Sequence, residues 1–254
     1  MSPFDLTGRV AVITGSSRGI GKAIAEAFAD QGAHVVISSR KAPACEAVAA
    51  ALNDLHGPGT AIAVPANISS KDELRALIDR TNAEFGRIDI LVCNAASNPY
   101  NGPMSGISDE QFTKVLHNNI LSNHWLIQMT APQMIERKDG AIVIISSLGG
   151  LKGQPTLGAY AISKAGDMQL ARNLAIEYGP HNVRVNCIAP GLIKTDFASA
   201  LWQNPDFLSR AVQVAALKRI GEAEEIAGAA LLLASRAGGF MTGQTIVIDG
   251  GASA

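Results

Sequence analysis

The chain has little cysteine, no cluster of metal-binding residues and no concentration of charge of one sign. Its 254 residues include three cysteines, Cys45, Cys93 and Cys187, which are far apart and flanked by small or apolar residues. An odd number of scattered cysteines argues against a disulfide scaffold and predicts buried thiols in a reducing compartment. The five histidines are equally scattered, so we expect no metal site. The formal net charge of -1, without any Lys or Arg run, argues against binding of nucleic acid or a membrane surface.

Long hydrophobic runs and linker segments are also missing. The N-terminal stretch MSPFDLTGRVAVITG has no basic start and only a short apolar run, which is typical of a strand rather than a signal peptide or membrane span. No tract rich in Pro, Gly or Ser divides the chain, and 47% of its residues are hydrophobic. We therefore predict a cytoplasmic protein built as a single domain over residues 1–254, with no membrane segment.

Seven short apolar runs alternate with longer segments of helical periodicity. The runs are RVAVIT, HVVISS, TAIAVP, IDILVC, GAIVIIS, VRVNCIA and QTIVIDG. They are apolar almost throughout, which is typical of parallel strands that helices cover on both faces. Segments such as 19–31 and 70–85 have the helical pattern. We predict an α/β fold, a single Rossmann-type doubly wound sheet of seven parallel strands flanked by helices, in which ligands bind beyond the carboxyl ends of the strands.

A glycine-rich turn, TGSSRGIG, connects the first predicted strand to the helix that follows. Gly15, Gly19 and Gly21 permit a tight turn, the close approach of a pyrophosphate and close packing of the helix on the strand. The helix N-terminus adds a field that favours negative charge. Methyltransferases and purely structural turns use similar segments, so the loop alone indicates nucleotide binding without specifying the nucleotide.

The end of the second predicted strand bears on which dinucleotide binds. An acidic residue at this place accepts from the ribose 2′-hydroxyl of NAD, whereas an arginine accommodates the 2′-phosphate of NADP. Here the strand ends in SSRK, where Ser38, Ser39 and Arg40 supply hydroxyls and a guanidinium but no carboxylate, and Arg18 can add a second positive charge. The alternative is that both arginines are solvated surface residues. We predict NADP(H) rather than NAD(H) as the cofactor.

The segment YAISK places Tyr160 and Lys164 one helical turn apart, on one face of a predicted helix. Alone, this spacing is more typical of an amphipathic pair with buried stems and exposed tips. Taken with the other motifs, it resembles the short-chain dehydrogenase/reductase family over essentially the whole chain. TGSSRGIG is similar to that family's cofactor loop, CNAAS to its Asn-Asn-Ala-Gly segment after the fourth strand, and YAISK to its Tyr-x-x-x-Lys motif.

The resemblance implies a set of catalytic residues. Ser147, thirteen residues before Tyr160, matches the family's catalytic serine, and Ser146 is the competing position. Asn119, in LHNNILSNHW, matches the helical asparagine that supports a water-linked proton relay, and Asn118 is the adjacent alternative. The catalytic residues implied in this way are Asn119, Ser147, Tyr160 and Lys164.

The resemblance also implies which residues line the cofactor, including RVNCIAPGLIKTD after the sixth strand. Three positions depart from the family's pattern: Cys93 replaces an Asn, Ala96 a Gly, and Asn67 an Asp that contacts adenine in many relatives. An amide at position 67 can still form hydrogen bonds. The cofactor-binding residues that we predict are Gly15, Ser17, Arg18, Gly19, Ile20, Gly21, Ser39, Arg40, Asn67, Ile68, Asn94, Ala95, Ala96, Tyr160, Lys164, Pro190, Gly191, Ile193 and Thr195.

This set implies a specific reaction. Hydride transfer from a nicotinamide to a carbonyl leaves an alkoxide that needs a proton, and a neutral Tyr160 can donate it. A neighbouring ammonium stabilises the phenolate that the reverse reaction requires. Lys164 therefore assists Tyr160 and holds the nicotinamide ribose, while Ser147 polarises the substrate oxygen.

The segment 192–217 is a long excursion with aromatic residues at roughly helical spacing, and in relatives this region forms a lid over the substrate. We predict a small helical substrate lid after the sixth strand. The substrate contacts that we predict are Ser147, Leu148, Phe197 and Trp202. An apolar lid favours a lipophilic compound, although these side chains can alternatively pack on the main domain or on a partner subunit.

We therefore predict an NADP(H)-dependent oxidoreductase that transfers a hydride between nicotinamide and a lipophilic ketone or secondary alcohol, with Tyr160 as general acid and base. SNP after CNAA, and TDF and LW in the lid, are similar to the carbonyl-reductase branch, and a 3-oxoacyl-[acyl-carrier-protein] reductase is the alternative. A non-catalytic NADP(H)-binding regulator is an alternative from another class, one that does not need Ser147, Tyr160 and Lys164 together. The terminal GQTIVIDGGASA resembles the strand and tail through which relatives associate, so we expect a homotetramer, or failing that a dimer.

Overall fold

The computed structural model describes residues 2–254, and its sheet contains all seven predicted strands. They are β1 (Val10–Thr14), β2 (His34–Ser38), β3 (Ala61–Ala63), β4 (Ile90–Cys93), β5 (Gly140–Ile145), β6 (Val183–Pro190) and β7 (Thr245–Ile248). All pairs are parallel, in the order β3-β2-β1-β4-β5-β6-β7, which confirms the predicted Rossmann-type sheet. β3 is shorter than the predicted run TAIAVP, since Pro65 has no N–H to donate to a ladder.

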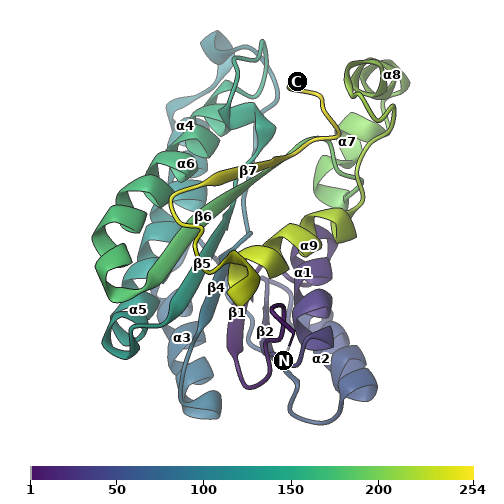
Figure 1. Cartoon of the computed structure of the whole chain (residues 1–254). Coiled ribbons are helices and arrows are strands. Elements are labelled where there is room, and N and C mark those ends of the chain that lie inside the picture. Colours follow the sequence, from purple (N-terminus) through teal and green to yellow (C-terminus); the bar gives the residue numbers. More distant parts are fainter. Residues whose placement is uncertain (1) are drawn as a thin grey trace.

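Helices connect the strands and cover both faces of the sheet (Figure 1). One face carries α1 (Gly19–Asp30), α2 (Ala42–His56) and α9 (Ala223–Ala234). The other carries α3 (Lys71–Phe85), α5 (Ser122–Arg137) and α6 (Gly158–Tyr178), with α4 (Asp109–Leu116) packed against α6. A π-helical turn, η2 (His117–Leu121), joins α4 to α5.

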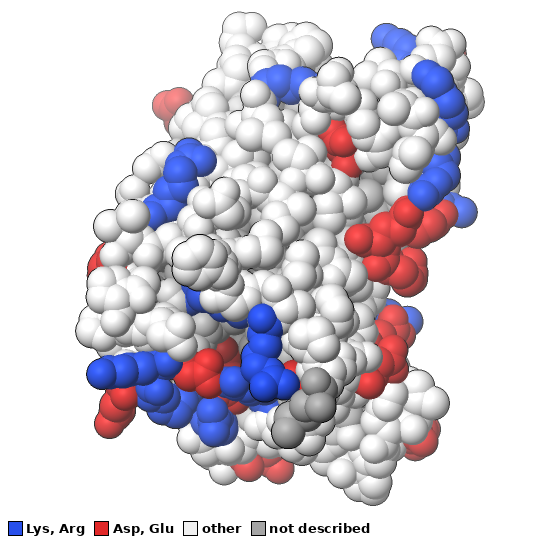
Figure 2. Space-filling model, in the orientation of Figure 1, with Lys and Arg blue, Asp and Glu red and all other residues white. Residues whose placement is uncertain are grey.

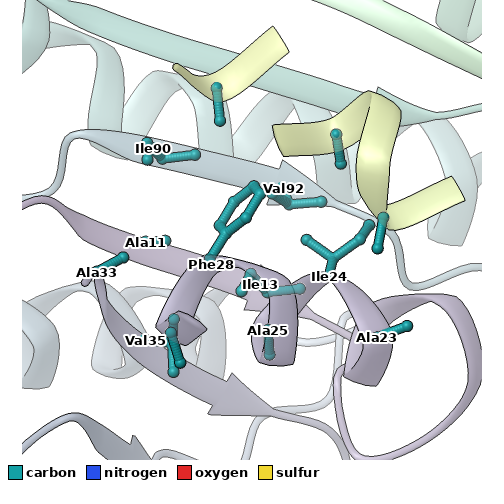
Figure 3. Packing of buried hydrophobic residues seen from close by; sticks show 14 of the residues in the cluster. Ala11, Ile13, Ala23, Ile24, Ala25, Phe28, Ala33, Val35, Ile90 and Val92 are labelled. Atoms are coloured by element: carbon teal, nitrogen blue, oxygen red, sulfur yellow. The ribbon is translucent and has the colours of Figure 1, made fainter. Parts of the chain in front are cut away.

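Two hydrophobic clusters hold these layers together, one on each face. Because successive strand residues point to opposite faces, Ile13 of β1 belongs to the first cluster and Val12 to the second. Figure 3 shows Phe28 and Ile24 of α1 packed over side chains of β1 and β4. Phe28 is completely buried, and burial of a side chain of this kind stabilises a fold by about 1.5–3 kcal/mol.

The strand order reverses between β1 and β4. The chain passes from β1 to β2 on one side of the sheet and returns to β4 on the other, so the loops at the carboxyl ends of these two strands diverge and leave a crevice. The glycine loop follows β1, residues 94–97 follow β4, Ser147 follows β5 and residues 191–195 follow β6. The predicted site segments therefore come together at one end of the sheet.

The chain between β6 and α9 is helical, as expected for the segment 192–217. It forms η5 (Asp196–Ala198), α7 (Ser199–Trp202) and α8 (Pro205–Val214). Asn204 begins α8 by accepting from the N–H of Phe207, and Pro205 occupies the first turn. In Figure 1, α8 projects from the body of the molecule on the side of α9.

The surface carries charged residues of both signs. On the face shown in Figure 2, Lys and Arg are interspersed with Asp and Glu, mainly around the edges of the view. Over residues 2–254, no helix is both long enough and apolar enough to cross a membrane.

Candidate functional site

The glycine loop is fitted closely against β4 by Asn94. The Asn94 Nδ2 donates to the carbonyl oxygens of Thr14 (2.8 Å) and Gly15 (3.2 Å). Gly15 has a φ of +67°, and a Cβ at this position would lie 2.8 Å from Asn94 Nδ2. A Cβ at Gly21 would lie 2.5 Å from both Asn94 Nδ2 and the Gly15 carbonyl oxygen. Any larger residue at 15 or 21 would push the loop off β4, whereas glycine keeps a cradle at the N-terminus of α1 that fits a pyrophosphate.

Two arginines reach the surface where β1 and β2 end. The two strand ends are tied together, because the Ser16 hydroxyl accepts from the Ser38 N–H at 2.9 Å. Arg40, directly beyond β2, is exposed. Arg18 is also exposed and forms an ion pair with Asp196 of η5, at 3.2 Å between Nη1 and Oδ2. The crevice beside the end of β2 thus presents positive charge, and Arg18 also connects the glycine loop to the segment after β6.

Tyr160 and Lys164 lie in the first two turns of α6. The Lys164 Nζ is 5.6 Å from the centre of the Tyr160 ring. Lys164 is only 2% exposed, and its Nζ donates to the carbonyl oxygen of Ile145 (2.8 Å) and to Oδ2 of Asp167 (3.0 Å). Burial acts against the ammonium, but the charge of Asp167, followed by Tyr160 and the hydrogen bond to Asp167, raises the pKa of Lys164.

The two serines at the end of β5 have different roles. Ser146 is buried and its hydroxyl donates to the Lys164 carbonyl oxygen at 2.7 Å, which packs β5 onto α6. Ser147 is half-buried, and its hydroxyl caps the short helix η3 (Leu148–Gly150) by accepting from the Gly149 N–H at 3.1 Å. This arrangement favours Ser147 over Ser146 as the serine that meets a substrate.

Both candidate asparagines lie in the π-helical turn η2 and bond to Ser97 in the loop after β4. The Asn119 amide accepts from the Ser97 N–H (2.8 Å) and donates to the Ser97 carbonyl oxygen (3.1 Å) and the Ser163 hydroxyl (3.0 Å). Ser163 in turn donates to the Tyr160 carbonyl oxygen at 2.7 Å. Asn118 donates to the Ser97 hydroxyl at 2.9 Å. Asn119 is therefore the one connected to Tyr160. π turns of this kind often occur at functional sites.

The helical segment after β6 rests on the glycine loop and reaches Tyr160. The Trp202 indole N–H donates to the Thr195 carbonyl oxygen at 2.8 Å, which holds α7 against the chain at Thr195. A Cβ at Gly19 would lie 3.2 Å from the Thr195 methyl group. The ring of Phe197 lies 6.2 Å from that of Tyr160 and is 57% exposed. Phe197 is thus placed beside the phenol, while Trp202 is engaged within the segment itself.

The remaining predicted residues border the same end of the sheet. Asn67 is held in its turn, since its N–H donates to Glu73 at 2.8 Å. Gly191 passes close to β7, where a Cβ would lie 2.8 Å from the Asp249 Cα. Pro190 and Ile193 are buried, and Ile68 packs against the core. Also half-buried at this end are Ser17, Ile20, Ser39, Ala95, Ala96 and Leu148.

Two residues outside the predicted set belong to this cluster. Asp167 is completely buried, and the Asn123 Nδ2 donates both to Asp167 Oδ1 (3.0 Å) and to the Asn119 carbonyl oxygen (2.6 Å). In the sequence, Asp167 follows Lys164 by three residues and Asn123 follows Asn119 by four. Both are spacings that place side chains on one helix face, and this signal could have identified them.

Known proteins share this architecture along the whole chain. A family model described as Enoyl-(Acyl carrier protein) reductase matches residues 15–253. Dehydrogenase/reductase SDR family member 4 of Mus musculus is 38% identical over 250 residues, which are 97% of this chain and 88% of the relative. A structure of 7α-hydroxysteroid dehydrogenase complexed with NADH and 7-oxo glycochenodeoxycholic acid has a TM-score of 0.93 at 36% identity, covering 98% of this chain and 96% of that chain. A 3-oxoacyl (acyl-carrier-protein) reductase from Agrobacterium tumefaciens with NADP bound has a TM-score of 0.90 at 37% identity, covering 98% and 95%.

The doubly wound sheet, the glycine cradle and the Tyr-Lys pair define an oxidoreductase of the class that uses nicotinamide cofactors. The chain belongs to the short-chain dehydrogenase/reductase family, which confirms the resemblance carried by its three motifs.

Proposed function

We propose that this protein is an NADP(H)-dependent oxidoreductase that interconverts lipophilic ketones and secondary alcohols, and that residues 192–217 are the substrate lid of a single catalytic domain. The observation that carries the proposal is the arrangement of Tyr160 beside the buried Lys164 ammonium, under the exposed ring of Phe197. A phenol, an ammonium and an apolar cover suit proton transfer to the oxygen of an apolar carbonyl compound.

The residues at the carboxyl ends of β1 and β2 fit a nicotinamide dinucleotide. The cradle of Gly15, Gly19 and Gly21 takes the pyrophosphate, since any Cβ at these positions would fall within 3.2 Å of a neighbouring atom. Arg40 and Arg18, with no carboxylate at the end of β2, suit the 2′-phosphate of NADP. When bound, the cofactor supplies or accepts the hydride.

Proton transfer is the task of the chain's own residues. In reduction, the Tyr160 hydroxyl donates its proton to the substrate oxygen, while the Ser147 hydroxyl donates a hydrogen bond to the same oxygen. The Lys164 ammonium, 5.6 Å from the Tyr160 ring, stabilises the phenolate that remains. A positioned acid of this kind contributes about 10²–10⁴ in rate. In oxidation the same groups act in reverse, with the Tyr160 phenolate as the base.

The lid bears on the class of substrate. The aromatic ring of Phe197 lies beside Tyr160, and the ion pair between Arg18 and Asp196 ties its segment to the glycine loop. This favours a lipophilic carbonyl compound, and the likeness to a structure that holds a 7-oxo bile acid is in keeping with it. The second candidate, reduction of a 3-oxoacyl group on acyl carrier protein, is supported by the 37% identity to a reductase of that name.

Location and assembly form part of the proposal. The three cysteines are buried and free, which suits the reducing cytoplasm, and we propose a cytoplasmic homotetramer.

The experiment is a turnover assay of the purified protein with NADPH and, separately, NADH. The substrates are aromatic ketones, diketones, quinones and a 3-oxoacyl thioester. We expect NADPH consumption with the lipophilic ketones and a kcat/KM for NADPH about tenfold or more above that for NADH, since a hydrogen-bonded contact between an arginine and a phosphate contributes on this scale. An equal or NADH-favouring ratio would contradict the cofactor assignment. A clear preference for the thioester would favour the second candidate, and tight NADPH binding without turnover would favour a regulator.

A further inference from the structure

Lys164 is paired with a carboxylate that lies away from the crevice. Lys164 and Asp167 are 2% and 0% exposed, and their charged atoms are 3.0 Å apart. The other carboxylate oxygen of Asp167 accepts from Asn123, which also donates to the Asn119 carbonyl oxygen in the π-helical turn. A chain of protein hydrogen bonds therefore runs from Asn119 through Asn123 and Asp167 to the ammonium.

The Lys164 ammonium has three N–H donors, and protein acceptors occupy two of them. Asp167 takes one and the carbonyl oxygen of Ile145 takes another. The third is left for the crevice side, where the Tyr160 ring lies. Asp167 and Ile145 thus orient the group that acts on Tyr160.

Few other titratable groups face the pair. On α6 it faces Tyr160, on β4 it faces Cys93 and on β6 it faces Cys187, whose thiol donates to the Asp167 carbonyl oxygen at 3.3 Å. Burial raises the pKa of both thiols, so they stay neutral, and Arg172 acts on Cys187 rather than on the pair. Burial also raises the pKa of Asp167 itself, against the opposing charge and hydrogen bond of Lys164 and the hydrogen bond from Asn123.

Resting on the proposed function, we propose that Asp167, held by Asn123, is a positioning residue that keeps Lys164 an ammonium beside Tyr160 and so extends carbonyl reduction to higher pH. A negative charge in contact with an ammonium opposes the loss of its proton. Without that charge, Lys164 becomes a neutral amine at lower pH. The phenolate that Tyr160 leaves after donating its proton then has no positive charge beside it.

The first test follows kcat for NADPH-dependent reduction against pH. In Asp167→Asn we expect the alkaline limb of the profile to move down by about one pH unit, as the loss of a charge at this range implies. Asn123→Ala, which removes one hydrogen bond of the carboxylate but keeps its charge, should move the limb by less. Asp79→Asn, an identical change on the exposed side of α3, should leave it in place. The inference is overturned if the alkaline limb of Asp167→Asn stays in place or moves up. This outcome is decisive when the parent enzyme turns over and Tyr160→Phe does not.

The second test needs neither cofactor nor substrate. The urea midpoints of Lys164→Met, Asp167→Leu and the double variant are compared with that of the parent. Because each single change leaves a buried charge without its partner, we expect the double variant to be at least as stable as either single variant. Losses that simply add would overturn the inference. If the parent enzyme shows no turnover, the proposed function is rejected. The comparison of urea midpoints can still be interpreted, because it does not depend on activity.

Discussion

Tyr160 and Lys164 have different surroundings although they share one face of α6. Tyr160 is half-buried beside the exposed ring of Phe197, so a substrate can reach its hydroxyl. Lys164 is buried behind it, bonded to Ile145 and Asp167. We therefore expect the phenol to exchange a proton with substrate and the ammonium to act through its charge and its remaining donor.

The replacement Tyr160→Phe tests this division at a single atom. We expect kcat to fall by about 10² or more, because the proton donor is lost, while the affinity for NADPH stays within a few-fold of the parent value. Steady-state kinetics and a fluorescence titration of NADPH measure the two quantities. Tyr178→Phe, further along the same helix, is the matched control and should retain turnover. Retained turnover in Tyr160→Phe would reject the catalytic assignment.

At the scale of elements, the glycine loop and α1 form a unit whose shape depends on glycines, which have no side chain. Asn94 reaches across from β4 into the space that Cβ atoms at Gly15 and Gly21 would fill. The loop, the strand and the helix N-terminus therefore hold one another in place, and the cradle for a pyrophosphate exists before any ligand arrives.

Opposite outcomes are expected for two glycine-to-alanine changes in helices. Gly21→Ala should destabilise the protein by about 1–3 kcal/mol, because its Cβ would collide with the Gly15 backbone, and should weaken NADPH binding. Gly228→Ala, at an exposed position in α9 with nothing within 4 Å of the new Cβ, should stabilise it by about 0.5–1 kcal/mol. Urea unfolding measures both. Equal stability of Gly21→Ala and the parent would contradict the proposed fit of the loop.

At the scale of the whole molecule, the edge of the sheet at β7 differs from its interior. Among residues 2–254, β7 pairs only with β6, and Val247 in its middle is 39% exposed, while Phe240, upstream of β7, is fully exposed. Figure 2 shows few charged side chains over the central part of this face. An apolar sheet edge of this kind is typical of an interface, since an exposed strand is otherwise prone to aggregate.

We accordingly expect multi-angle light scattering to give four times the chain mass, or failing that twice. Val247→Glu should lower the assembly state, because it places a charge in the middle of the exposed strand. Glu177→Gln, a surface change on α6 away from β7, should not. A parent protein of one chain mass would contradict the proposed self-association.

Local patterns in the sequence are enough to predict the strands and main helices, their order along the chain, and the end of the sheet where the candidate site residues gather. Apolar runs such as GAIVIIS and the period of the helical segments are local patterns, and parallel strands joined by helices leave few possible topologies. The motifs around Gly15, Ser147 and Tyr160 could be placed for the same reason. Their spacing along the chain is enough to bring them to one end of the sheet.

Contacts between separate elements are needed to tell which of two neighbouring residues turns toward the crevice and which is held inside. Ser146 bonds to α6 whereas Ser147 caps η3, and Asn119 bonds to Ser163 on α6. The folded structure also places Asp167 on Lys164 and joins it through Asn123 to another helix. The contact of Ser146 with Lys164 joins residues 18 positions apart, and the contacts of Asn119 with Ser163 and of Asn123 with Asp167 join residues 44 positions apart. Burial and hydrogen bonding at these contacts decide between adjacent side chains.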